Sequence, residues 1–75
     1  MKLNKLKIND TAIITNLLVN NNIKKRLLDI GMSKGSKIKK VLENKNMITY
    51  NIKGANIAIR KTDTKNVEVT KWKLV

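Results

Sequence analysis

The segment from Arg26 to Ser36 constrains the possible folds of this chain more than any other part of its sequence. It reads RLLDIGMSKGS, an apolar helical stretch that runs into Gly31 and is followed four residues later by Gly35. Glycine often ends a helix because it adopts the left-handed conformation at little cost. A basic segment rich in β-branched residues begins directly afterwards, at 37–42. The pattern predicts a short helix, a tight turn and a strand.

The start of this helix is also visible in the sequence. Asn20, Asn21 and Asn22 are residues whose side chains can accept hydrogen bonds from the free amides of a first helical turn. Ile23, Leu27 and Ile30 follow at the spacing of one helical face. A helix this short is unstable alone, so we expect its apolar face to be buried against the rest of the domain.

The remainder of the chain predicts β-structure. Alternating and β-branched segments separated by turn residues predict strands at 12–19, 37–42, 47–52, 55–60 and 67–70. The first of these has apolar residues on both faces, so its register cannot be assigned. Residues 1–9 predict an irregular lead-in, residues 61–65 a connector, and Trp72 and Val75 a tail that packs back on the domain. The pattern favours a small β-barrel with one helix between its first two strands.

Length and composition bound what this fold can do. The chain has 75 residues, so we expect a single domain, 1–75, with one thin core and no deep cleft. It has no cysteine, which excludes disulfides and fits a reducing cytoplasm. No apolar run is long enough to cross a bilayer and no signal-peptide pattern is present. We expect a soluble protein that stays where it is made.

The chain lacks the residues on which most catalytic and metal sites depend. Without histidine or cysteine, it has neither the commonest general base nor the usual zinc ligands. Ser33 and Ser36 lie in a turn with no base nearby. The dispersed carboxylates are Asp10, Asp29, Glu43, Asp63 and Glu68. We therefore predict no enzymatic activity, no cofactor and no tight metal site.

The formal net charge of +12 suggests an acidic partner, which can be a nucleic acid, anionic lipid or an acidic protein surface. A coding composition rich in lysine, asparagine and isoleucine gives the same charge with no binding role, and both origins of the charge stay open. Single-strand binding by small barrels usually needs aromatic platforms. The chain offers only Tyr50 and Trp72, although charge alone supports non-specific binding.

The order of these motifs resembles the ferrous iron transport protein A family, also called the FeoA-like domain. The family joins a leucine-rich helix to a Leu-Gly-Leu turn, a Pro-Gly pair and a strand, which 26–32 and Gly35 match here. A hairpin ending in glycine, an Ile-Ala-Leu-Arg strand and an Ile-x-Val strand follow in the family. Gly54, 57–60 and 67–69 match these motifs. The resemblance extends from residue 6 to residue 69.

Three positions depart from the family pattern. Lys34 stands where proline is usual, Asp10 where glycine is common, and Thr64 where alanine is usual. None of these three departures involves a functional side-chain group of the family pattern, so the expected fold is unchanged.

The resemblance implies a mainly β fold, a small SH3-like barrel of about five strands with one short inserted helix. It also implies a cytosolic accessory role beside a large membrane transporter of ferrous iron that carries a GTPase domain. Similar domains form the C-terminal part of metal-dependent repressors, but this chain has no helix-turn-helix segment. Family members are often associated with metal, which the residues here do not support.

We therefore predict a module that docks on the cytosolic GTPase-bearing part of the transporter and modulates it. The expected contact surface is the helix and the turn after it. Lys24, Lys25 and Arg26 would reach acidic groups, and Leu28 and Met32 would offer apolar contact, although core packing is an equal alternative for both. The basic surface also favours the anionic inner leaflet, so the expected location is cytoplasmic, including the inner face of the membrane. The alternative function is a small basic nucleic-acid-binding β-barrel.

Overall fold

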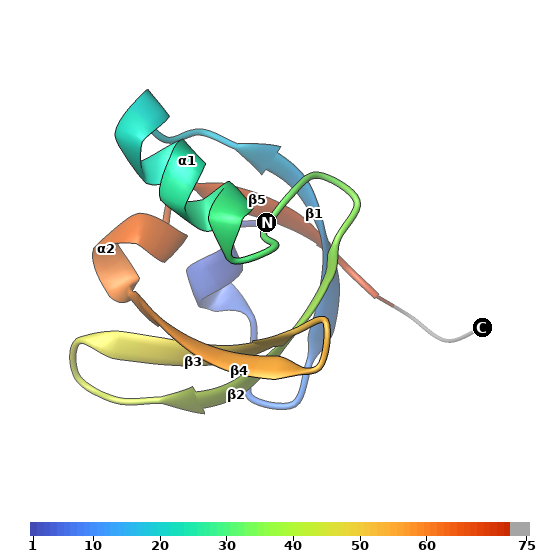
Figure 1. Cartoon of the computed structure of the whole chain (residues 1–75). Helices are drawn as coiled ribbons and strands as arrows, with labels where there is room; N and C mark the ends of the chain where they lie inside the picture. Colours follow the sequence, from blue (N-terminus) through green and yellow to red (C-terminus); the bar gives the residue numbers. More distant parts are fainter. Residues whose placement is uncertain (73–75) are drawn as a thin grey trace.

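Five antiparallel strands form one curled sheet, in the order β4-β3-β2-β1-β5, in the computed structural model, which describes residues 1–72 (Figure 1). Helix α1, Asn21–Asp29, lies between β1 and β2, as the sequence predicted. The strands are β1 Thr11–Leu17, β2 Lys37–Glu43, β3 Met47–Ile52, β4 Ala55–Arg60 and β5 Val67–Lys71. The predicted mainly β fold is confirmed.

Two further helical turns occupy segments that were expected to be irregular. A 3-10 turn, η1 (Leu3–Lys5), precedes β1, and a single α-helical turn, α2 (Lys61–Thr64), joins β4 to β5. Figure 1 places α1 and α2 on the same side of the curled sheet. Of the predicted tail, Trp72 is described, whereas Val75 lies outside the described residues.

A bulge explains why the register of β1 could not be assigned from its sequence. Ala12, Ile14 and Leu17 are the buried residues of this strand. The interval between buried residues along the strand changes from two residues to three, because the pairing with β5 shifts register between Ile14 and Asn16. A bulge adds one residue to a strand and so breaks the alternation of faces.

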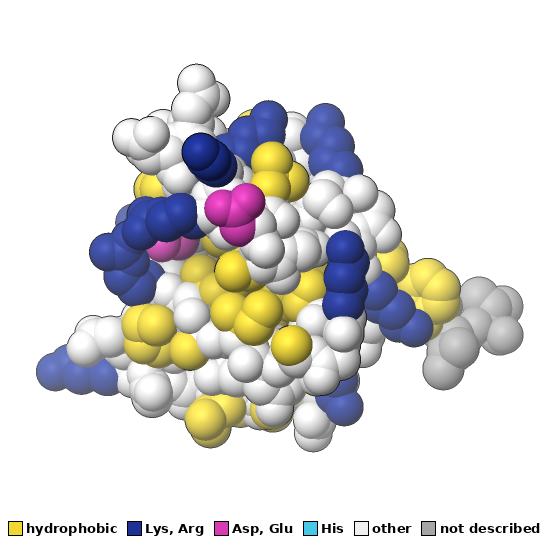
Figure 2. All heavy atoms as spheres, in the orientation of Figure 1, with side chains coloured by type: hydrophobic (Ala, Val, Ile, Leu, Met, Phe, Trp, Pro, Cys, Tyr) yellow, Lys and Arg dark blue, Asp and Glu magenta, His cyan; other side chains and the backbone are white. Residues whose placement is uncertain are grey.

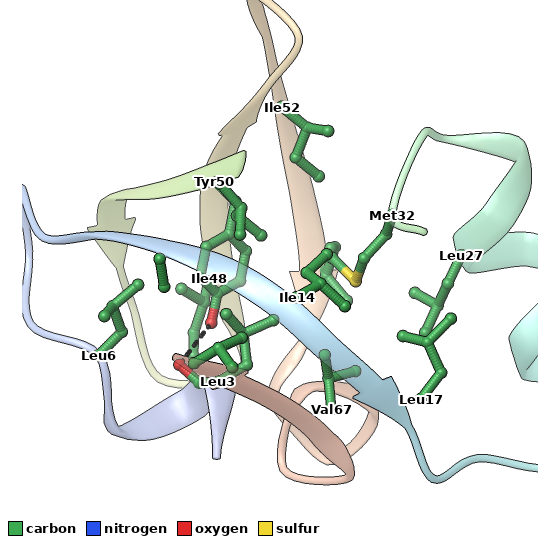
Figure 3. Packing of buried hydrophobic residues seen from close by; sticks show 14 residues of the cluster. Leu3, Leu6, Ile14, Leu17, Leu27, Met32, Ile48, Tyr50, Ile52 and Val67 are labelled. Atoms are coloured by element: carbon green, nitrogen blue, oxygen red, sulfur yellow. Dashed lines mark hydrogen bonds between the residues drawn. The ribbon is translucent and has the colours of Figure 1, made fainter. Parts of the chain in front are cut away.

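The N-terminal segment is part of the core, whereas the sequence predicted only an irregular lead-in to the first strand. Leu3 and Leu6 are 0% and 1% exposed and belong to the same buried cluster as the inward residues of the strands. Figure 3 shows the Tyr50 hydroxyl pointing toward Leu3, whose carbonyl oxygen accepts a hydrogen bond from it at 3.4 Å. Burial raises the pKa of Tyr50 well above its usual value. The hydroxyl therefore stays protonated and ties the N-terminal segment to β3.

A buried lysine joins the N-terminal segment to the sheet and to α2. The side chain of Lys40 is 4% exposed, and its Nζ donates to the Leu6 carbonyl oxygen at 2.8 Å. It also pairs with Glu43, whose other oxygen lies 2.9 Å from Lys61 Nζ. Hydrogen bonds from Lys40 and then Lys61 lower the pKa of Glu43 to about 2. This cluster serves the fold, because it links three segments that are distant in sequence.

Candidate partner-docking surface

Helix α1 begins where the asparagine run predicted. Asn20 is the N-cap, with extended backbone, and its side-chain oxygen accepts a hydrogen bond from the Ile23 amide at 3.0 Å. This contact satisfies one of the amides that a first helical turn leaves without a partner. The apolar face of the helix is directed toward the core, with Leu27 at 4% exposure and Ile23 and Ile30 partly buried.

The end of α1 turns the chain back toward the core and overturns one predicted contact residue. Gly31 has φ of +92°, and its N–H donates to Leu28 while the Met32 N–H donates to the Leu27 carbonyl at 2.9 Å. These two bonds form a Schellman motif, in which the residue after the glycine packs against the last turn of the helix. Met32 is accordingly 0% exposed and joins the core cluster with Leu27 (Figure 3). It cannot offer a surface contact in this conformation.

The other four predicted contact residues lie on the surface of α1. Lys24, Lys25 and Arg26 are exposed, and Leu28 is 44% exposed. Lys24 and Leu28 are four residues apart, so they share one stripe of the helix. An apolar side chain next to an ammonium group suits a partner surface that has both apolar and acidic residues.

Four of the five acidic side chains pair with basic residues outside α1. Asp10, Glu43, Asp63 and Glu68 each lie within 4.0 Å of a lysine or arginine nitrogen. None of those pairs, within residues 1–72, includes Lys24, Lys25 or Arg26. The remaining carboxylate, Asp29, is on α1 itself and forms none of these ion pairs. The charge of α1 is therefore available to an external acidic group.

A shallow apolar groove borders α1. It has a volume of about 350 Å³ and runs between the helix, β4 and α2. Figure 2 shows hydrophobic atoms exposed in this region, with basic side chains to either side. The lining residues are Arg26, Leu27, Ile30, Met47, Ile57, Ala58, Ile59, Arg60 and Asp63. The β4 residues were not among the predicted contact residues, because only the sheet order places them beside α1.

A second hollow, of about 370 Å³, carries basic side chains on its rim. Lys37, Lys39 and Lys53 line it together with residues of β1, β2 and the β3–β4 turn. Lys37 Nζ lies 4.5 Å from the centre of the Trp72 ring, a cation–π contact. The Trp72 amide donates to the Thr11 carbonyl oxygen at 2.8 Å. Trp72 therefore packs back on the barrel as predicted, against residues of β1 and β2, and is still 43% exposed.

The comparison with known families decides what kind of domain this is. The model of the FeoA domain matches residues 1–71. The chain belongs to the FeoA domain family. FeoA domains are non-enzymatic accessory domains of ferrous iron transport, which confirms the expectation that this chain is not an enzyme.

Solved structures agree with this assignment of the FeoA domain. The FeoA protein of Chlorobium tepidum is 27% identical, with a TM-score of 0.92 over 97% of this chain and 71% of that one. The iron(II) transport protein A of Clostridium thermocellum is 29% identical, with a TM-score of 0.89 over 95% of this chain and 45% of that one. None of the curated proteins matches the chain at a significant level.

The FeoA of Stenotrophomonas maltophilia supports the SH3-like description of the fold. It is 24% identical, with a TM-score of 0.78 over 93% of this chain and 89% of that one. That protein is described as a prokaryotic SH3-domain protein in complex with zinc, and as a candidate activating factor of bacterial ferrous iron transport.

The residues of this FeoA domain do not fit a zinc site of the usual kind. The chain has no histidine and no cysteine, and within residues 1–72 no three acidic side chains come close enough to hold a metal ion. The same part of the chain contains no helix that is long and apolar enough to cross a membrane.

Proposed function

We propose that this FeoA domain docks on the cytosolic, GTPase-bearing part of a membrane ferrous iron transporter and modulates it. Family membership links the chain to ferrous iron transport. The observation that carries the proposal further is the exposed basic triplet Lys24, Lys25 and Arg26, whose charges have no ion-pair partner within residues 1–72. Such a surface suits an acidic region of a partner protein.

The position of the triplet favours a role in recognition rather than in folding. The buried face of α1 is formed by Leu27 with Ile23 and Ile30, so the charged side chains contribute little to the core. Charges at the rim of an interface act mainly on the association rate and its dependence on salt. Leu28, on the same stripe as Lys24, would supply the apolar contact.

The direct test is titration of the isolated GTPase-bearing domain with this protein and with the double variant K24E/R26E. We expect the double variant to bind about tenfold more weakly or worse at low salt, since exposed ion pairs contribute about 0.2–1 kcal/mol each and reversal adds repulsion. The difference should shrink as salt rises. Circular dichroism should show an unchanged fold.

The matched control is K7E/K45E, which makes the same change in net charge. Both lysines are exposed, and they belong to the loop before β1 and the β2–β3 hairpin, which lie away from α1 (Figure 1). Equal loss of affinity in both double variants would mean that only net charge matters. Unchanged affinity of folded K24E/R26E would place the interface elsewhere.

The nucleic-acid alternative receives less support. Tyr50 is fully buried and offers no face for a base. Trp72 has one face next to the ammonium group of Lys37, although its ring stays partly exposed. Stacking platforms are what single-strand binding by small barrels usually requires. Binding of random-sequence DNA at physiological salt, as tight as binding of the transporter domain, would favour this alternative.

Contact with an anionic membrane is a separate expectation of the basic surface. Each basic residue near an anionic leaflet contributes about 1 kcal/mol. Binding to an anionic membrane is measured by co-sedimentation with vesicles that contain phosphatidylserine, compared with neutral vesicles. Binding to anionic vesicles by K24E/R26E at the level of the unmodified protein would show that α1 is not the membrane-facing surface.

A further inference from the structure

The two edges of the sheet are protected differently. The outer edge of β5 is covered by the N-terminus, because the Val69 amide donates to the Met1 carbonyl oxygen at 2.8 Å and Lys2 forms a bridge with Glu68. The other edge strand is β4. Within residues 1–72, no segment pairs with the outer side of β4.

The register of the β3–β4 hairpin identifies the free backbone groups. Lys53 and Gly54 both have positive φ, 51° and 85°, as a two-residue type I′ turn requires. Residues that exchange both ladder hydrogen bonds alternate with residues that exchange none. The Lys61 amide donates to the Asn46 carbonyl at 3.0 Å, which fixes the alternation.

Ile57 and Ile59 are therefore bonded to β3, opposite Tyr50 and Ile48. The intervening residues, Asn56 and Ala58, direct their backbone N–H and C=O groups away from β3. Both residues are exposed.

The usual protection of an exposed strand edge is missing here. Natural edges carry bulges, prolines or charged side chains that prevent pairing with another chain. The β3–β4 ladder has no register shift over its six pairs. From Ala55 to Ile59, β4 carries no charge and no proline, and Arg60 is its last residue. The strand is regular and open to pairing over most of its length.

The apolar groove lies beside this edge. It is lined by Ile57, Ala58 and Ile59 of β4 and by Leu27 and Ile30 of α1. A strand added to β4 would direct alternate side chains to opposite faces. One set of side chains would enter the groove, where apolar groups fit. The other set would face solvent near Arg26 and Arg60, which line the groove together with Asp63, the ion-pair partner of Arg60.

We propose that the free edge of β4 binds an extended segment of another protein, with alternating apolar and acidic residues, as an additional strand. Main-chain hydrogen bonds to Asn56 and Ala58 give the register, and the groove selects the apolar side chains. The net charge of +12 favours an acidic segment and opposes pairing of two copies of this chain. Strand addition at this edge does not require the transporter as partner.

The test is nuclear magnetic resonance on the ¹⁵N-labelled protein with a capped peptide of about eight residues that alternates valine and glutamate. At millimolar peptide, the amides of Asn56 and Ala58 should shift and exchange with solvent at least about tenfold more slowly, while the amides of β5 stay unchanged. A peptide that alternates valine and lysine should have no such effect. The absence of any shift or protection with the valine–glutamate peptide would overturn the proposal.

A pair of variants distinguishes main-chain pairing from non-specific binding of the peptide. Ala58→Pro removes an outward N–H but no bond to β3, since Ala58 faces Thr49 in a pair without ladder bonds. We expect it to weaken peptide binding at least about tenfold, whereas Ala58→Ser, which keeps the N–H, should bind normally. Full binding by folded A58P would overturn the proposal.

Two further measurements address misfolding of A58P and self-association of the chain. Should A58P not fold, protection of the Asn56 and Ala58 amides in the unmodified protein decides the matter. Analytical ultracentrifugation gives the mass without peptide. A dimer that already protects these two amides would mean that a second copy occupies the edge, and would overturn the proposal.

Discussion

The ammonium group of Lys40, almost fully buried, pairs with the carboxylate of Glu43, three residues along the same strand. An ion of this kind is costly to bury unless its partners are in place. Here the Leu6 carbonyl and Glu43 are those partners, and Lys61 adds a second contact to the carboxylate. The pair therefore makes the packing of η1 and α2 against β2 depend on one acidic side chain.

Glu43→Gln should lower the melting temperature of the domain, because it leaves the Lys40 charge buried without its counter-ion. Glu68→Gln is the matched control, since Glu68 pairs with Lys2 at 3.9 Å and both of those side chains are more than one third exposed. Thermal denaturation followed by circular dichroism compares the two. If the melting temperature of E43Q fell no further than that of E68Q, the structural role of the buried pair would be contradicted.

The same carboxylate should give the domain a defined acid sensitivity. The pKa of Glu43 falls from 4.5 to about 2 on folding, through hydrogen bonds from Lys40 and Lys61. The unfolded chain takes up a proton first as pH falls, so this contribution to stability is complete above about pH 4.5 and is lost toward pH 2. Urea denaturation between pH 2 and pH 6 measures the slope. E43Q should lose less stability than the unmodified protein over that window.

Met32 and Leu28 should respond very differently to truncation. Met32→Ala removes a fully buried side chain and should cost about 2–5 kcal/mol of unfolding free energy, enough to unfold much of a domain this small. Leu28→Ala, at a position 44% exposed, should cost less than about 1 kcal/mol. Urea denaturation measures both. Similar small decreases in unfolding free energy for the two variants would contradict the burial of Met32.

The N-cap of α1 provides another matched pair of variants. Asn20→Ala removes the side chain that accepts from the Ile23 amide and should cost about 0.5–2 kcal/mol. Asn22→Ala lies two residues further on, inside the helix and exposed, where alanine is the better helix former. It should be neutral or slightly stabilising. Equal effects of the two substitutions would argue against capping by Asn20.

Local features of α1 could be predicted from the sequence because they depend on neighbouring residues. An asparagine cap, an apolar face at 23, 27 and 30, and a glycine at the end specify where the helix begins and ends. The Lys53–Gly54 turn is equally local. The exposure of Lys24, Lys25 and Arg26 followed from the same periodicity, which leaves them off the buried face. Whether they bind a partner stays a prediction.

The burial of Met32 had a local signal that the prediction did not use. The residue after a helix-ending glycine commonly packs on the last turn of the helix. The alternation of β1, by contrast, could not be predicted, because its bulge exists only in the pairing with β5.

Only the tertiary structure determined which distant segments meet. Leu3 and Leu6 became core residues because the barrel leaves an open end that the N-terminal turn fills, and Lys40 became buried because Leu6 and Glu43 stabilise its charge there. The free edge of β4 and its groove against α1 likewise follow from the strand order. A sequence pattern specifies which face of an element is apolar, but burial and pairing partners depend on contacts between residues far apart in the chain.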